Sequence, residues 1–204
     1  DLPGGGHVTW FNGGPERPIK TSTDTPMGLL VGAVYRFRIG QMPEYPGVEL
    51  YPSVEVIDRL HPPAGKSAAY PVPIPFTPLE IEQAVSGQLV TKVIFLEQPN
   101  RAAPVAASPI GAIPTRVVGT QQNPLEVADV YGRPLLIVRL GGRLPDPGNE
   151  PRAFYGSCAP VLPMAAPKPV RPRPAAPAPA IEQPAVEEPA VEEPATEEPR
   201  PEEN

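Results

Sequence analysis

The sequence predicts a mainly β chain: an antiparallel, β-sandwich-like domain with two short capped helices, followed by a disordered C-terminal tail. Three observations lead to this fold class. The 204 residues include 35 prolines, which cannot donate a backbone hydrogen bond and so disfavour a mostly helical fold. Apolar and polar residues alternate in several segments of strand length. Two helix-start signals each precede an apolar segment.

Three parts of the chain differ in composition. Residues 1–26 are rich in Gly, Pro and Thr and are predicted to be an irregular segment packed on the domain, with one short strand at residues 7–12. Residues 27–159 are predicted to form the β-rich domain. Residues 160–204 contain few large apolar side chains, so burial cannot offset the entropy lost on ordering, and this tail is predicted to be disordered.

The strongest strand signal lies in residues 27–39. In the run Tyr35-Arg36-Phe37-Arg38-Ile39 the apolar and charged side chains alternate, which places them on opposite faces of a strand. The arginines are expected to form cross-strand pairs with Glu49 and Glu55. Pro52 is expected at an edge or a bulge. Five further strands are predicted: residues 48–60, 69–76 (an edge strand with alternate prolines), 89–96, 115–119 and 135–140.

The clearest local signals are two helix starts. In Thr77-Pro78-Leu79-Glu80, Thr77 can cap the helix, Pro78 suits its first position and Glu80 completes a capping box. Gly87 would end this helix. The run Asn123-Pro124-Leu125-Glu126, followed by Gly132, repeats the pattern. The repetition can reflect duplication or independent use of common capping chemistry.

The order of these elements favours a sandwich with helical crossovers. An α+β roll is the competing layout. Turn signals separate the strands where full crossover helices would be needed for a doubly wound parallel sheet, so that fold is disfavoured.

Charge is concentrated near the C-terminus. The net charge is −6, and the residues from Ile181 onward carry nine Glu and one Arg, a net of −8. The predicted domain is therefore nearly neutral and has no one-sided basic surface for nucleic acid. A basic stretch, Lys168 to Arg173, precedes a five-residue repeat of Glu-Glu-Pro-Ala-Val type. Such a segment favours extended polyproline II and is expected to act as a spacer.

Cysteine content and hydropathy limit other possibilities. Cys158 is the only cysteine, so it is expected either to pack as a small apolar side chain or to link two chains. No run reaches the 18 or more apolar residues of a membrane span. The first residue is Asp1, not Met, which is the pattern of a removed export signal or of a trimmed sequence.

No catalytic, cofactor or metal site is predicted. His7 and His61 are the only histidines. Asp58 and His61 could form a metal or acid–base site, but such sites need further convergent groups, and a surface turn is the favoured interpretation of His61. The chain is therefore predicted not to be an enzyme.

Exposed aromatic residues offer a possible ligand site. Trp10, Phe11, Tyr45 and Tyr51 could form a platform for sugar or peptide, with Trp10, Tyr45 and Tyr51 as the candidate contacts. The alternative is that each of these residues completes a core or covers a sheet edge.

Four segments resemble an exported or envelope protein family of planctomycete-type bacteria that has no assigned activity. They are Val8-Thr9-Trp10-Phe11-Asn12-Gly13-Gly14, Tyr35-Arg36-Phe37-Arg38-Ile39, Val54-Glu55-Val56-Ile57-Asp58-Arg59-Leu60-His61-Pro62-Pro63 and Pro124-Leu125-Glu126-Val127-Ala128-Asp129. The resemblance covers about two thirds of the chain and omits the tail. It implies an envelope location and no activity.

These observations predict a non-enzymatic structural or interaction protein, exported to the periplasm, the cell envelope or the extracellular space. Its β-rich domain would carry an extended acidic, proline-rich spacer, and its partner would be a protein or a cell-envelope polymer, without nucleic acid, cofactor or membrane span. The alternative is a carbohydrate- or peptide-binding module that uses the aromatic residues. A hydrolase built on Asp58 and His61 is a third hypothesis.

Overall fold

A computed structural model of the chain describes residues 2–98, 100, 115–119, 121–156 and 158–165. These residues belong to one compact unit, Asp1–Lys168. Residues 101–114 and most of the predicted disordered tail, residues 166–204, lie outside the described residues.

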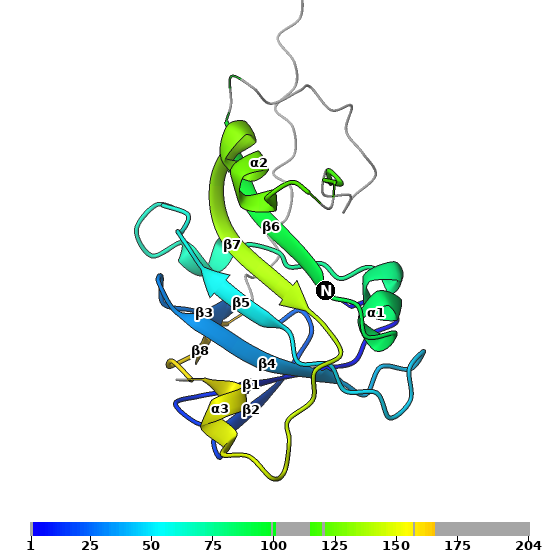
Figure 1. The fold of residues 1–204 in the computed structure, drawn as a ribbon. Helices are drawn as coiled ribbons and strands as arrows, with labels where there is room; N and C mark the ends of the chain where they lie inside the picture. Colours follow the sequence, from blue (N-terminus) through cyan, green and yellow to red (C-terminus); the bar gives the residue numbers. More distant parts are fainter. Residues whose placement is uncertain (1, 99, 101–114, 120, 157, 166–204) are drawn as a thin grey trace, which may run out of the picture. The chain divides into compact units, whose positions relative to one another are not determined.

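The compact unit is built on a six-stranded antiparallel sheet (Figure 1). In spatial order its strands are β2 (Pro18–Ser22), β1 (His7–Phe11), β4 (Val34–Gly40), β5 (Ser53–Val56), β7 (Gly132–Leu140) and β6 (Val90–Glu97). A two-stranded ribbon pairs β3 (Met27–Gly28) with β8 (Leu162–Pro163). The mainly β fold is confirmed. The sandwich is not confirmed, because the described residues form one large sheet and a short ribbon.

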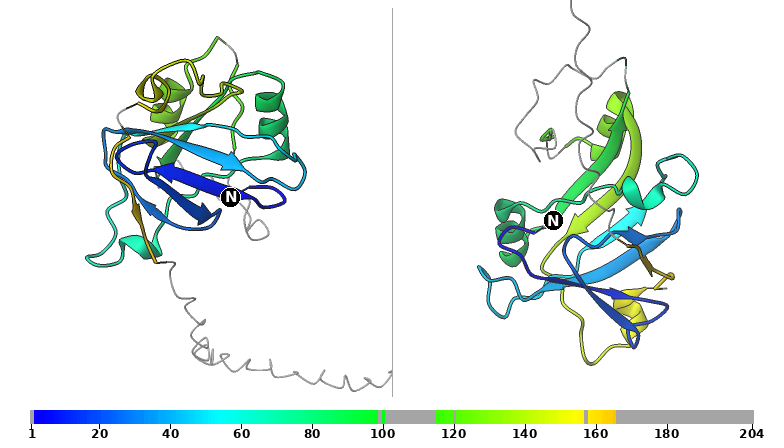
Figure 2. Two further views of the ribbon diagram at one scale, coloured as in Figure 1. Left: turned by 90° about the horizontal axis from the view of Figure 1, so that it is seen from below. Right: turned by 180° about the vertical axis from the view of Figure 1, so that it is seen from behind.

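The sheet is strongly twisted, so that β6 and β7 run at a steep angle to β1 and β2 (Figure 2). Strand β4 lies between β1 and β5 and shows the expected alternation. Its residues Tyr35, Phe37 and Ile39 are buried on one face, whereas Arg36 and Arg38 lie on the other. A period of two therefore decides which side chains enter the main core.

Two long predicted strands are shorter than expected. The predicted strand 27–39 is divided into β3 and β4 by a turn in which the Gly32 N–H donates to the Val56 carbonyl. The predicted strand 48–60 is reduced to β5 and an isolated bridge between Ile39 and Leu50. Pro52 lies between them, and its carbonyl accepts from the Phe37 N–H. Proline interrupts the ladder because it has no N–H to donate.

The two ends of the unit differ from the predicted boundaries. Residues 1–26 are less irregular than predicted, because β1 and β2 pair along their length and add two strands to the sheet. At the other end, Val161 is buried and Leu162 pairs with Gly28 in the ribbon. The folded part therefore continues past residue 159.

Helices α1 (Pro78–Val85) and α2 (Pro124–Tyr131) begin at the expected residues. The Thr77 side chain accepts from the Glu80 N–H, and the Glu80 carboxylate accepts from the Thr77 N–H at 2.8 Å. At α2, the Asn123 side chain accepts from the Leu125 N–H. The two starts thus satisfy free backbone donors through different side-chain geometries. A third helix, α3 (Pro151–Tyr155), has no counterpart among the predictions.

Strands β6 and β7 form the longest pairing, with a register shift between Ile94 and Phe95. Gly132, at the start of β7, lies where an added Cβ would be 2.2 Å from the Leu96 carbonyl oxygen. The close approach of the two backbones therefore requires glycine at this position.

Two predicted strands are absent. Residues 69–76 form an extended coil after the 3₁₀ turn Ser67–Ala69, and residues 115–119 have no regular structure. Lys92 of β6 holds this coil: its ammonium donates to the Pro75 carbonyl, pairs with Glu80 at 2.9 Å and lies 4.5 Å from the Phe76 ring centroid. Proline at alternate positions suits an extended segment that makes few ladder hydrogen bonds. None of the described helices is long and apolar enough to cross a lipid bilayer.

Candidate functional site

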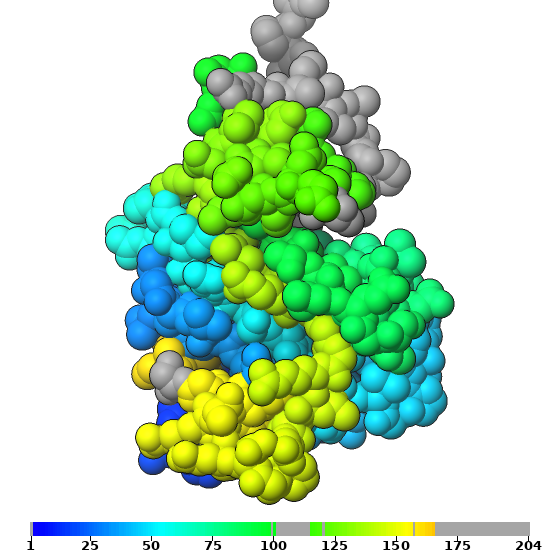
Figure 3. All heavy atoms as spheres, viewed as in Figure 1, coloured from blue at the N-terminus to red at the C-terminus, as the bar shows by residue number. Residues whose placement is uncertain are grey.

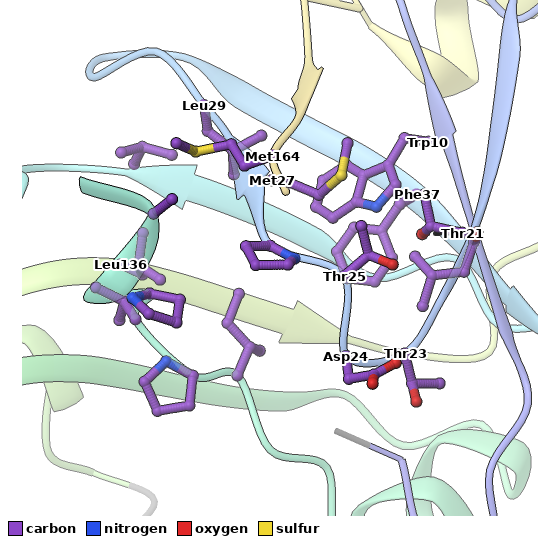
Figure 4. A pocket seen from close by; sticks show the side chains of 18 of the residues that line it. Trp10, Thr21, Thr23, Asp24, Thr25, Met27, Leu29, Phe37, Leu136 and Met164 are labelled. Carbon is purple, nitrogen blue, oxygen red and sulfur yellow. Dashed lines mark hydrogen bonds between the residues drawn. The ribbon is translucent and has the colours of Figure 1, made fainter. Parts of the chain in front are cut away.

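A pocket of about 490 Å³ lies on the face of the sheet that carries Trp10 and Phe37 (Figure 4). Its walls are formed by β1, β4 and β5 of the sheet, by the β3–β8 ribbon region, and by the coil that precedes α1. Ligand pockets commonly have volumes of about 300–1,000 Å³. The space is therefore large enough for a small ligand or for a few residues of a peptide.

Two stacked aromatic rings form the floor of the pocket. Trp10 of β1 and Phe37 of β4 are direct cross-strand partners, and their ring centroids are 4.6 Å apart with an interplanar angle of 28°. Trp10 is 7% exposed and Phe37 is 3% exposed. Cross-strand aromatic pairs of this kind stabilise a sheet by both packing and burial. The floor is therefore a rigid part of the main core.

The Trp10 indole N–H has no hydrogen-bond partner among the described residues. In that part of the chain, Arg36 Nε is the one side-chain nitrogen or oxygen that is both buried from solvent and without a partner. The indole nitrogen therefore keeps contact with solvent. Because an indole N–H in an apolar setting normally finds an acceptor, this donor is suited to a carbonyl oxygen supplied by a ligand.

Methionine side chains and residues of a proline-rich coil line the rest of the pocket. Met27 and Met164 reach it from the ribbon region, as the close-up shows (Figure 4). Val72, Ile74 and Phe76 contribute from the proline-rich coil before α1. Methionine adapts its shape to irregular partners. This wall can therefore adjust to an occupant, whereas the aromatic floor cannot.

The rim beside β2 is polar. The hydroxyls of Ser22 and Thr25 share a hydrogen bond of 2.9 Å, and Asp24 lies between them in the sequence. A hydrogen bond from Ser22 lowers the pKa of Asp24, so its carboxylate is charged at neutral pH. Asp24 has no salt-bridge partner among the described residues. The rim thus offers a negative charge beside an apolar pocket.

The opposite face of the sheet carries a second aromatic cluster, formed by Phe11, Tyr51, Phe154 and Cys158. The Tyr51 hydroxyl donates to the Glu49 carboxylate at 2.7 Å. Burial raises the pKa of Tyr51, and the hydrogen bond and charge of Glu49 raise it further. The Arg36 guanidinium lies 4.4 Å from the centroid of the Phe154 ring and donates to the Phe154 carbonyl. Helix α3 supplies Phe154 to this cluster and Tyr155 packs against it.

The structure does not bring the three predicted ligand contacts together. Trp10 lies in the pocket, Tyr51 lies on the opposite face, and Tyr45 lies in a turn that bridges to Met42. Trp10 and Tyr51 are 7% and 9% exposed, so the predicted exposed platform is wrong. The alternative interpretation, in which these aromatics complete the core, is correct for both.

The predicted charge pairs are only partly formed. Arg38 pairs with Glu49 at 3.0 Å, as expected. Glu55, however, pairs with Arg139 of the neighbouring strand β7 at 3.0 Å, and Arg36 packs on Phe154. Arg36 and Arg139 both lie opposite Ser53, on the two sides of β5. The Arg36 guanidinium is engaged by the ring and the carbonyl of Phe154, so Glu55 pairs with Arg139.

The other residues considered for chemistry are exposed or have other partners. His7 and His61 are exposed, and Asp58 pairs with Arg133 at 3.1 Å. Cys158 is a free, buried cysteine, and burial raises the pKa of its thiol, as expected for a packed apolar side chain. The described residues contain no group of three or more His, Cys, Asp or Glu side chains placed to hold a metal ion.

Three pocket residues were not singled out by the sequence. Phe37 was predicted as a core residue by its alternation with Arg36 and Arg38, a signal that does not reveal an adjacent pocket. Met27 was placed inside a long strand, and Met164 was assigned to the tail. No local pattern marks the pairing of β3 with β8, because the paired residues are more than 100 positions apart.

Comparison with known proteins adds no assignment: no protein-family model, no curated protein and no solved structure matches the chain.

Proposed function

We propose that this chain is a non-enzymatic interaction protein of the cell envelope or the extracellular space, and that its pocket binds an extended, proline-rich polypeptide segment. The observation that carries the proposal is the pocket itself: an aromatic floor with an unpartnered indole N–H, beside an apolar and adaptable wall.

Polyproline II segments have the chemistry that this pocket would accept. They form no internal hydrogen bonds, so their carbonyl oxygens remain free to accept from a donor such as the Trp10 indole. Proline-rich ligands commonly dock in grooves lined by aromatic residues, because little entropy is lost when a pre-extended segment binds. An apolar floor next to one donor meets both requirements.

A carbohydrate ligand fits less well. Sugar rings stack on the open face of an aromatic side chain. One face of the Trp10 indole is covered by Phe37, and the residue is 7% exposed. Tyr45 and Tyr51, the other predicted sugar contacts, lie outside the pocket lining. The arrangement therefore favours a peptide over a sugar.

The proposed cellular location is argued from the sequence alone. The resemblance to an exported planctomycete-type family and the acidic, proline-rich composition of the C-terminal region support an envelope or extracellular site. Cell fractionation tests this directly. The chain is expected to sediment with isolated envelope or to be found outside the cell, and recovery in the cytoplasm would contradict the location while leaving the binding proposal untouched.

Because Trp10 is the only tryptophan, its fluorescence reports on the pocket. Titration with a synthetic peptide of alternating Ala and Pro is expected to give a saturable blue shift of the emission. An alanine–serine peptide of equal length should leave the emission unchanged. A saturable shift with a chitin or cellulose hexasaccharide, and none with the proline peptide, would favour the carbohydrate alternative.

A matched pair of variants tests whether the peptide binds in the pocket. Met27→Gln puts a polar group in the apolar wall and is expected to weaken peptide binding about tenfold, because an amide must be desolvated without a partner. Leu30→Gln changes a residue that is 56% exposed and outside the lining, and affinity should be unchanged. Equal affinities for both variants would contradict the assignment.

A further inference from the structure

We infer that the pocket selects its ligand by charge, and that the preferred partner is a proline-rich segment with a Lys or Arg side chain at one end and a carboxylate about six or seven residues away. The inference rests on the proposed function, because it names the charge pattern of the peptide that the same pocket binds. It is carried by two charged side chains of the pocket lining that have no ion-pair partner, and by their places at opposite ends of the strands.

The described residues that line the pocket include three charged side chains, those of Asp24, Asp58 and Arg59. Asp58 pairs with Arg133 at 3.1 Å. Asp24 and Arg59 form no salt bridge with any described residue, and therefore none with each other. The pocket thus offers a ligand one carboxylate and one guanidinium that are not already engaged in an ion pair of the fold.

Asp24 lies at one end of the strands. It is two positions beyond Ser22, the last residue of β2, and Ser22 is the register partner of His7. His7 in turn lies opposite Gly40, the last residue of β4. The Asp24 side chain is exposed, and its hydrogen-bond partner is the nearby Ser22. It can therefore pair with a cation of the ligand without breaking an ion pair of the described fold.

Arg59 lies at the other end of the strands. It is three positions beyond Val56, the last residue of β5. Strand β5 runs antiparallel to β4, with Glu55 opposite Val34, the first residue of β4. Arg59 therefore follows the end of the sheet at which β4 begins, whereas Asp24 follows the end at which β4 finishes.

The length of β4 estimates how far apart the two charges lie along the pocket. Strand β4 has seven residues, so its ends are about 20 Å apart at roughly 3.3 Å per residue. The close-up agrees with this order, because Asp24 and Leu136, the register partner of Val56, lie on different sides of the pocket (Figure 4). Polyproline II rises about 3.1 Å per residue, so an extended ligand would span this distance with about six or seven residues.

The aromatic floor lies between the two charges. Phe37 is the middle residue of β4, and Trp10 is its register partner. A segment that gives a central carbonyl oxygen to the indole N–H therefore has its two ends near Asp24 and Arg59. A segment with like charges at both ends would place one of them beside a side chain of the same sign, which disfavours binding.

The test follows Trp10 emission in the full chain with peptides whose ends are acetylated and amidated. Arg-Ala-Pro-Ala-Pro-Ala-Pro-Glu should bind about tenfold more tightly than the neutral peptide that has Ala in place of Arg and Glu, because each exposed ion pair strengthens binding about threefold. The peptide Arg-Glu-Ala-Pro-Ala-Pro-Ala-Pro has the same composition. Its adjacent charges cannot meet both side chains, so it should bind like the neutral peptide.

Single substitutions assign each charge of the peptide to its partner. Asp24→Asn and Arg59→Gln should each weaken binding of the Arg/Glu peptide about threefold and leave the neutral peptide unaffected. Asp129→Asn and Arg17→Gln change exposed residues outside the pocket lining, and both affinities should be unchanged. In about 1 M NaCl, where the Debye length is about 3 Å, the advantage of the charged peptide should disappear.

Several outcomes would overturn the inference. Saturable binding with equal affinities for the charged and the neutral peptide would overturn it and leave the proposed function intact. The same holds if a peptide with Arg at both ends binds more tightly than the Arg/Glu peptide, or if the tenfold preference persists in Asp24→Asn and in Arg59→Gln. If no peptide gives a saturable change in emission, the proposed function and the inference fail together.

Discussion

The two faces of the six-stranded sheet bury their aromatic residues in different ways. On one face, Trp10 and Phe37 stack nearly parallel, and a pocket remains above them. On the other face, Tyr51 and Phe154 meet edge to face at 5.3 Å, beneath helix α3. Figure 3 shows the segment that contains α3, in yellow, at the surface on this second side.

The difference follows from what covers each face. Helix α3 supplies Phe154 and Tyr155, whose rings lie among those of Phe11 and Tyr51. The other face is covered around the pocket by extended, proline-rich coil and a two-stranded ribbon. Extended segments with prolines present fewer large side chains per unit length than a helix does, so they leave space. One face is therefore closed by aromatic rings under a helix, whereas the other combines the main core with room for a ligand.

The largest expected effect is on the pocket face. Phe37→Ala should lower the free energy of unfolding by about 4 kcal/mol, since a large buried ring is lost and Trp10 loses its partner. Urea denaturation followed by circular dichroism measures this value. Leu162→Ala, at a residue that is 66% exposed, should change stability by less than about 0.5 kcal/mol.

The matching change on the opposite face is Phe154→Ala. We expect a loss of about 3 kcal/mol, because α3 lies at the surface and can relax around the missing ring. Cys158 should then become accessible, and its alkylation by iodoacetamide, followed by mass spectrometry, should be faster than in the unaltered chain. If Phe154→Ala costs more than Phe37→Ala, the face under α3 contributes more to stability, and the comparison must be revised.

The raised pKa of Tyr51, on the second face, makes the stability of the folded chain depend on pH. The folded chain keeps the phenol proton at a pH where the unfolded chain has lost it. Stability should therefore fall as the pH rises above the ordinary tyrosine pKa of about 10. Tyr51→Phe should reduce this fall and cost about 1 kcal/mol at neutral pH through the lost hydrogen bond to Glu49. Urea titrations at pH 8 and pH 11 measure both effects, and Tyr70→Phe, at an exposed tyrosine, is the control.

The smallest effect concerns Arg36. Burial lowers the pKa of its guanidinium, and its Nε is buried without a partner in the described part of the chain. Arg36→Met keeps the packing of the stem on Phe154 and removes the desolvated charge, so stability should change by less than about 1 kcal/mol. Arg36→Ala should be clearly more destabilising in the same urea assay. Equal losses in the two variants would show that the charge itself holds α3.

Local signals in the sequence identified much of the secondary structure. The starts of α1 and α2 were found because a capping residue and its partner are two or three positions apart. The buried face of β4 was found because a strand alternates its side chains with a period of two. The same reasoning missed the local pairing of β1 with β2, in which Phe11 lies opposite Pro18. It could not find α3 or the ribbon, because their contacts are with residues distant in the sequence.

The sequence by itself determined that the chain is mainly β, which residues of β4 are buried and where two helices begin, since each depends on neighbours within a few residues. Only the tertiary structure decided that Trp10 and Tyr51 lie on opposite faces and that Met27 and Met164 line one pocket with Trp10. The physical reason is that a pocket is bounded by side chains brought together by long-range strand pairing. The order in which strands pair is set by the packing of the whole core and is not encoded in any single segment.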